Sequence, residues 1–210
     1  MIFAFFAGLA AGSLHVFSGP DHLAAVAPLV ADSEAQPDRS RGNPRWHLEG
    51  WITGMQWGVG HTAGVLLIAT LLLMLRDQLP LDAVSLYSER LVGLSLIAVG
   101  AWGVWKASRR DPRPHTHAGA SFAMGALHGL AGSSHLFGVL PALAFASRLD
   151  SGLYLVGFGI GAIAAMSAFA AGIGMLAFRG GGPHQRRYRG FLYASSAAAL
   201  VIGGVWLAGH

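Results

Sequence analysis

The chain has 210 residues, of which 53% are hydrophobic and only 11% are charged, and its formal net charge is +4. A soluble domain of ordinary composition has about a quarter charged residues, so this composition, with a mean hydropathy of +0.51, indicates an integral membrane protein. The basic residues lie mainly in predicted loops, which argues against a nucleic-acid-binding surface. The absence of cysteine excludes disulfide bonds and thiolate metal ligands.

Six apolar segments are long enough to cross a bilayer, which takes roughly 20 mostly apolar residues in a helix. The first and fourth are too long for one straight span; the first contains Gly19-Pro20 and the fourth contains Gly132 within HGLAGSSH. Proline removes a helical hydrogen bond and clashes with the preceding turn, which favours a break at Gly19-Pro20. From the length of both segments and the HGLAGSSH stretch of the fourth, we predict that both are broken helices. The N-terminal segment lacks a basic region, and we do not expect a signal peptide. The predicted spans cover about residues 2–30, 50–75, 86–106, 120–147, 152–178 and 189–208.

The Lys and Arg residues are distributed unevenly among the five predicted loops. Eleven of the fourteen lie in or beside residues 31–49, 107–119 and 179–188, and three lie on the opposite side. Basic loops tend to stay on the cytoplasmic side of a membrane. We therefore predict that these three loops are cytoplasmic, that both termini lie outside the cytoplasm, and that the chain resides in the cytoplasmic (inner) membrane.

The two halves of the chain show an internal repeat. HVFSGPDHLAAVAPLV (15–30) aligns with HGLAGSSHLFGVLPAL (128–143) at an offset of 113, which places a pair of histidines in each half at matching positions. After a longer first loop the similarity resumes at an offset of 101, where residues 87–105 align with 188–206. Three spans in each half would give the halves opposite orientations, which is a common arrangement in transporters.

We therefore predict an all-α integral membrane protein with six transmembrane helices arranged as two inverted three-helix repeats. The single transmembrane domain spans residues 1–210. Its repeats cover about residues 1–106 and 120–210, and a cytoplasmic linker covers residues 107–119. In transporters of this kind the substrate site lies near the midplane, on the broken helices.

Asp21 is the one acidic residue that lies well inside a predicted span. A charged residue there costs at least ~2.5–3.5 kcal/mol and marks a functional site by default. The SGPD sequence could also cap a second half-helix, and the two roles are compatible. In an unbroken helix His15 and His22 would lie about 10.5 Å apart along the axis, too far for one ion with metal–nitrogen bonds of roughly 2.0–2.1 Å. A break at 17–20, where Gly19 can take dihedrals that other residues avoid, would let them converge.

Further histidines in the apolar segments extend this candidate site. Imidazole is the commonest side-chain metal ligand, and imidazole with carboxylate but no thiolate suits nickel, cobalt, zinc or iron. His115 and His117 lie in the basic linker, where a solvated segment and a cytoplasmic metal-capture site are both open interpretations. The candidate ligands within the spans are His15, Asp21, His22, His61, His128 and His135.

These motifs resemble those of the nickel/cobalt transporter superfamily, most closely its small members of the UreH and HupE/UreJ kind. The larger permeases carry H-x4-D-H, whereas this chain has the longer spacing of the short members, with Val16 at the position of a proline. GHTAG (60–64) and HGLAGSSHL (128–136) are similar to later histidine motifs of the family. The resemblance covers nearly the whole chain. It implies that His15, Asp21 and His22 recognise nickel or cobalt, and it extends to the histidines of the later motifs.

The leading functional prediction is transmembrane transport of a divalent transition metal ion, most favourably nickel or cobalt, without enzymatic activity or a prosthetic group. The ion is the substrate, and the bilayer, a metallochaperone or a second copy of the chain are the partners considered. No nucleotide-binding loop is present, so active transport would need a partner or an ion gradient. The direction of transport stays open.

Three alternatives remain at this point. A haem-binding membrane electron carrier could use two helical histidines as axial ligands. An intramembrane metalloenzyme would need a motif such as H-E-x-x-H or a second carboxylate near the histidines, and neither is found. A ligand-free membrane assembly factor would leave Asp21 unexplained.

Overall fold

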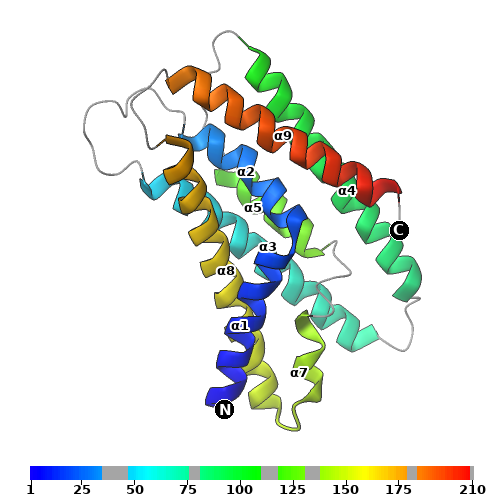
Figure 1. The fold of residues 1–210 in the computed structure, drawn as a ribbon. Helices are drawn as coiled ribbons and strands as arrows, with labels where there is room; N and C mark the ends of the chain where they lie inside the picture. Colours follow the sequence, from blue (N-terminus) through cyan, green and yellow to red (C-terminus); the bar gives the residue numbers. More distant parts are fainter. Residues whose placement is uncertain (35–46, 76–80, 110–117, 131–137, 179–183, 209–210) are drawn as a thin grey trace.

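The computed structural model describes residues 1–34, 47–75, 81–109, 118–130, 138–178 and 184–208. Within these ranges the regular secondary structure is entirely helical, which confirms the predicted all-α class (Figure 1). Most helices extend a few residues beyond the predicted spans at their N-terminal ends. The helices are α1 (Ile2–Ser18), α2 (Pro20–Glu34), α3 (His47–Leu75), α4 (Leu81–Ser108), α5 (Ala118–Leu130), α7 (Pro141–Ala144), α8 (Arg148–Phe178) and α9 (His184–Ala208).

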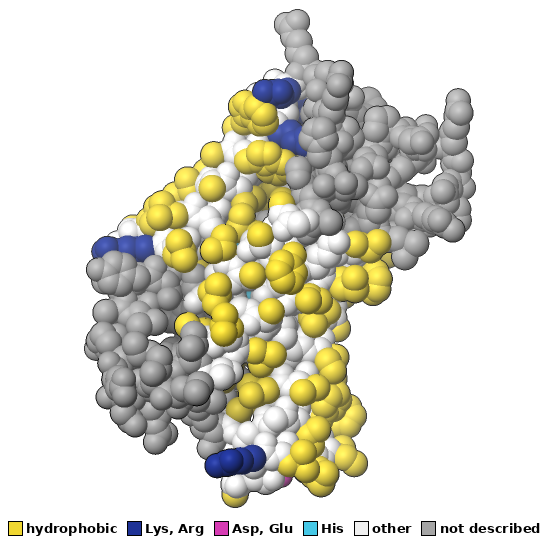
Figure 2. All heavy atoms as spheres, turned by 180° about the vertical axis from the view of Figure 1, so that it is seen from behind, with side chains coloured by type: hydrophobic (Ala, Val, Ile, Leu, Met, Phe, Trp, Pro, Cys, Tyr) yellow, Lys and Arg dark blue, Asp and Glu magenta, His cyan; other side chains and the backbone are white. Residues whose placement is uncertain are grey.

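Several of these helices are long and apolar enough to cross a membrane. Three segments meet this criterion alone, namely Arg90–Ser108 in α4, Arg148–Met175 in α8 and Arg189–Ala208 in α9, and the bent pair of α1 and α2 would make a fourth. Large apolar side chains point outward from the bundle: Phe3 is 78% exposed and Val201 is 66% exposed. Figure 2 shows apolar side chains spread over one face and basic side chains near its edges. This surface is typical of a membrane protein.

The bundle is built from four closely packed helix pairs: α1 with α8, α3 with α5, α4 with α9, and α3 with α8. The first two pairs approach so closely that there is no space for a side chain at the crossing. A β-carbon at Gly12 of α1 would overlap the carbonyl oxygen of Phe158 in α8, and one at Gly125 of α5 would overlap that of Trp57 in α3. Small residues allow such backbone contact between helices in lipid.

A second set of glycines makes the same kind of contact one or two turns away. A β-carbon at Gly60 of α3 would overlap the carbonyl oxygen of Phe122, and one at Gly161 of α8 would overlap that of Leu9. The positions of α1 and α5 along α8 and α3 are therefore set by backbone contact. This packing brings the C-terminal parts of α1 and α5 to the middle of the bundle, where the core includes Val16, Trp57, Leu96 and Met166.

The first predicted break is confirmed. Helix α1 ends at Ser18, α2 begins at Pro20, and the two helices are bent by 74°. Proline is well suited to the first position of a helix because its missing N–H would have no intrahelical partner there. The break is shorter than the expected 17–20, since only Gly19 lies between the helices. The second predicted break, at Gly132, lies outside the described residues.

Candidate metal centre

Four histidines from four helices meet at the bend between α1 and α2. His15 comes from the end of α1, His22 from the start of α2, His61 from α3 and His128 from α5. The ring of His22 lies 4.9 Å from that of His15 and 4.9 Å from that of His61, measured between centroids. The rings of His15 and His61 stack at 5.6 Å. The interruption at Gly19 thus brings together two imidazoles that a continuous helix would separate.

Three of these histidines form a compact set of nitrogen donors. One ring nitrogen each from His15, His22 and His61 lies within 4.8 Å of the other two. Nitrogens that share one ion at roughly 2.0–2.1 Å are about 3.3–3.5 Å apart in a tetrahedral arrangement. Small side-chain rotations would therefore close the set around a single ion. The structure brings these three predicted ligands together from three different helices.

Asp21 lies beside the histidines, in contact with His22. Its Oδ1 lies 3.0 Å from Nδ1 of His22 and accepts a hydrogen bond from it, because a carboxylate can only accept. In that tautomer Nε2 of His22 carries the lone pair that can bind a metal. Histidine ligands commonly donate their other nitrogen to a carboxylate, which orients the ring and increases its basicity. The geometry therefore favours Asp21 as the partner that orients His22 over Asp21 as a direct ligand.

Gly19 is required for space, and the conformational reason given from the sequence was wrong. Its φ of −92° and ψ of 98° lie in the extended region, which any residue can adopt. A β-carbon at this position would overlap Nδ1 of His22 and would lie 3.0 Å from Oδ1 of Asp21. A side chain here would thus displace the hydrogen-bonded pair. Ser18, which was considered as a cap for the second helix, instead donates to the carbonyl of His15.

The cluster formed by His15, Asp21, His22, His61 and His128 is enclosed on most sides. His22, His61, His128 and Asp21 are at most 3% exposed, whereas His15 is only partly buried. A buried carboxylate beside the imidazoles would partly neutralise a divalent cation where water does not screen charge. His15 is thus the member of the cluster through which an ion could exchange with the surroundings.

Two aromatic side chains that the sequence interpretation did not single out form the walls of the cluster. The indole of Trp57 stacks on His61, with centroids 5.0 Å apart, and also contacts His22 and His128. The ring of Phe158 lies 5.6 Å from that of His15. Trp57 precedes His61 by four residues, a spacing that places both side chains on the same face of a helix. That spacing is the signal by which Trp57 could have been predicted.

Of the remaining predicted site residues, the structure describes only His128. His128 belongs to the cluster but lies outside the compact set of three nitrogen donors. Its ring is 6.1 Å from that of His22, and its Nδ1 is 3.3 Å from the carbonyl oxygen of Met124. His135 and Gly132 lie outside the described residues, as do His115 and His117 of the linker.

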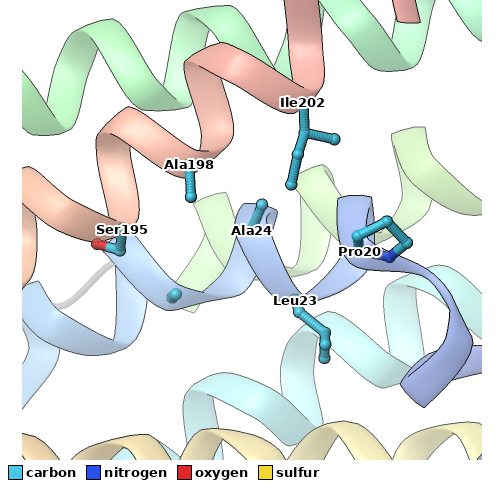
Figure 3. A pocket seen from close by; sticks show the side chains of 7 residues that line it. Pro20, Leu23, Ala24, Ser195, Ala198 and Ile202 are labelled. Atoms are coloured by element: carbon cyan, nitrogen blue, oxygen red, sulfur yellow. The ribbon is translucent and has the colours of Figure 1, made fainter. Parts of the chain in front are cut away.

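A separate apolar cavity of about 260 Å³ lies between α2 and α9. Ala198 and Ile202 of α9 point toward α2 across it (Figure 3). Its described lining offers one hydroxyl, from Ser195, and neither an imidazole nor a carboxylate. This cavity is therefore unsuited to a metal ion and is distinct from the histidine cluster.

Two proteins of Arabidopsis thaliana are similar to this chain. Chloroplast protein for growth and fertility 2 is 35% identical in an alignment 212 positions long that covers 93% of this chain and 54% of that protein. Chloroplast protein for growth and fertility 1 is 35% identical in an alignment 189 positions long that covers 80% of this chain and 48% of that protein. The chain thus spans about half the length of these curated relatives. No protein-family model and no solved structure matches it.

Proposed function

We propose that this chain transports a divalent transition metal ion across a membrane, with nickel or cobalt as the favoured substrates. The observation that carries the proposal is the convergence of His15, His22 and His61 within 4.8 Å at a helix break. Three imidazoles without thiolate form a donor set that suits nickel, cobalt and zinc. The resemblance of the histidine motifs to the nickel/cobalt transporter superfamily favours the first two.

The environment of the cluster suits a transported ion. Ionisable residues at membrane depth are costly and characteristically mark substrate pathways. Asp21 supplies one negative charge beside the imidazoles through its hydrogen bond to His22. His15 is partly exposed, so one ligand can exchange with water while the other two hold the ion. These features favour reversible binding over a closed structural site.

We propose that six spans form two inverted three-helix repeats, and the glycine contacts support this arrangement. Gly125 follows Gly12 by 113 positions, and their contact partners Phe158 and Trp57 are separated by 101. These are the two offsets at which the halves of the sequence align. The α1–α8 contact thus has a counterpart in the α5–α3 contact.

The other glycine contacts repeat with the same offsets. Gly161 follows Gly60 by 101 positions, and their partners Phe122 and Leu9 differ by 113. Two independent contacts would not share both offsets unless equivalent helices crossed in equivalent ways. Each half therefore contributes its first helix to the second helix of the other half, as a two-fold exchange of the halves requires.

We propose the cytoplasmic (inner) membrane as the location, with both termini outside the cytoplasm. The end of α2, the start of α3, the end of α8 and the start of α9 lie toward one end of the molecule (Figure 1), and two of the three basic loops, 31–49 and 179–188, connect these helix ends in the sequence. The two similar Arabidopsis proteins are named as chloroplast proteins. A plastid membrane is therefore the alternative that a localisation experiment should include.

The alternatives fit the site less well. Axial ligation of haem requires a macrocycle between two imidazoles, whereas His15 and His61 stack at 5.6 Å with His22 beside both. A ligand-free assembly factor would not require imidazoles from three helices and a carboxylate to be gathered in an apolar core. Metal transport accounts for both the residue types and their convergence.

Reconstitution tests the proposal directly. The purified chain in liposomes that contain a nickel-quenched fluorophore should admit Ni²⁺ at a rate well above that of empty liposomes. His22→Ala and His61→Ala should each reduce this rate at least tenfold, because two imidazoles bind an ion much more weakly than three. Thr70→Ala is the matched control on α3, since Thr70 is exposed and its hydroxyl donates to the carbonyl of Leu66 in its own helix. Rates in both histidine variants equal to that of the control would overturn the proposal.

A further inference from the structure

Two histidines of the cluster, His15 and His128, have matching aromatic neighbours. The ring of His15 lies 5.6 Å from that of Phe158, and the ring of His128 lies 5.6 Å from that of Trp57. His128 follows His15 by the offset of 113, and Phe158 follows Trp57 by the offset of 101. The two histidines are thus equivalent positions of the two halves, and each is covered by an aromatic ring from the second helix of the other half.

His22 neighbours both of these positions. The ring of His22 is 4.9 Å from that of His15 and 6.1 Å from that of His128. The indole of Trp57 contacts His22, His61 and His128 and so links these three imidazoles. An ion bound to His22 and His61 therefore has two candidate third ligands, His15 and His128.

These two histidines differ in this conformation. His15 belongs to the compact donor set and is partly exposed, whereas His128 lies outside the set and is 1% exposed. Nδ1 of His128 lies 3.3 Å from the carbonyl oxygen of Met124, one turn earlier in α5. Among the described residues, His15 thus completes a three-imidazole set with His22 and His61, whereas His128 is buried outside that set.

We propose that His15 and His128 are alternative third ligands, and that the ion crosses the centre of the membrane by exchanging one for the other while His22 and His61 hold it. This inference rests on the proposed transport function and adds a path to it. If His128 binds before His15 leaves, the ion passes through a four-imidazole state and never has fewer than three imidazoles in a low-dielectric interior. A movement of α5 relative to α1 would reverse which of the two histidines completes the site.

The inference separates binding from transport, and two variants test it. In the conformation described, His15→Leu should raise the dissociation constant for Ni²⁺ at least tenfold and abolish transport. His128→Leu should leave the dissociation constant within about threefold of wild type, because His128 is outside the donor set, and yet reduce transport at least tenfold. Ser167→Ala, which changes a buried side chain of α8 that donates to the carbonyl of Ile163 in the same helix, is the control for altered packing.

The measurements are equilibrium Ni²⁺ binding in detergent and Ni²⁺ flux in liposomes, on the full chain. Comparable loss of Ni²⁺ binding in both histidine variants would overturn the proposed exchange of His15 for His128, and so would wild-type Ni²⁺ flux in His128→Leu. If His128→Leu does not purify as a folded protein, His128→Gln serves, since its amide is polar but a poor nickel ligand; the same two results apply. Absence of binding and flux in the wild-type chain would instead contradict the proposed function itself, so the two failures are distinguishable.

Discussion

Substitution of Gly19 by alanine tests how the helix break builds the site. The added β-carbon would overlap Nδ1 of His22 and approach Oδ1 of Asp21 to 3.0 Å, so the hydrogen-bonded pair must move. The backbone at residue 19 is extended, and alanine adopts it without strain. Loss of the carboxylate that orients a metal-binding histidine typically weakens metal binding about 10–100-fold. We therefore expect Gly19→Ala to raise the dissociation constant for Ni²⁺ by about that factor, measured by isothermal titration calorimetry.

The control for this prediction is Gly172→Ala. A β-carbon at Gly172, inside α8, would meet nothing within 4 Å, so this variant adds the same methyl group to an open position. It should bind Ni²⁺ like the wild type, and its helix should be somewhat more stable, because alanine is favoured over glycine by roughly 0.5–1 kcal/mol. A folded Gly19→Ala variant that binds Ni²⁺ as tightly as Gly172→Ala would refute the role assigned to the break.

Three further predictions concern charge, packing and the linker. Asp21→Asn keeps the shape of the side chain but removes its charge, and we expect about 10–100-fold weaker Ni²⁺ binding by equilibrium dialysis with normal membrane insertion; unchanged binding would exclude the orienting role. Gly125→Val would force α5 away from α3 and should lower the free energy of unfolding in detergent, measured by thermal unfolding, by at least about 1–3 kcal/mol. Gly152→Val, at an open position, should have a clearly smaller effect in the same thermal unfolding assay, and equal effects would contradict the close crossing. Replacement of His115 and His117 by alanine should lower Ni²⁺ flux modestly or not at all; a loss as large as in the cluster variants would place the linker in the site.

The position of the helix break was predictable because its cause is local. Proline is disfavoured inside a helix, and Gly19-Pro20 lies in a segment too long for one straight span, so the pair predicts an interruption there, although Pro28 is accommodated within α2. The break is what allows His15 and His22 to converge, because seven residues of straight helix cannot bring both imidazoles to one ion. Local chain chemistry therefore accounts for the first half of the donor set.

The remaining features of the site depend on tertiary packing. The sequence indicates that Asp21 is near the histidines, but only the position of its Oδ1 beside Nδ1 of His22 distinguishes an orienting partner from a ligand. The contribution of Gly19 depends on the place of the His22 ring, which backbone preferences do not reveal. Likewise, the contact of Trp57 with three imidazoles depends on how α3 crosses α2 and α5.

The central claim is that His15, His22 and His61 together bind one metal ion, and X-ray absorption spectroscopy of the nickel-loaded chain tests it most directly. The spectrum should show one tightly bound nickel per chain, with three imidazole nitrogens at roughly 2.0–2.1 Å, and one imidazole should be lost in His61→Ala. A nickel ion surrounded only by water and carboxylate oxygens, or an imidazole count unchanged in His61→Ala, would contradict the account.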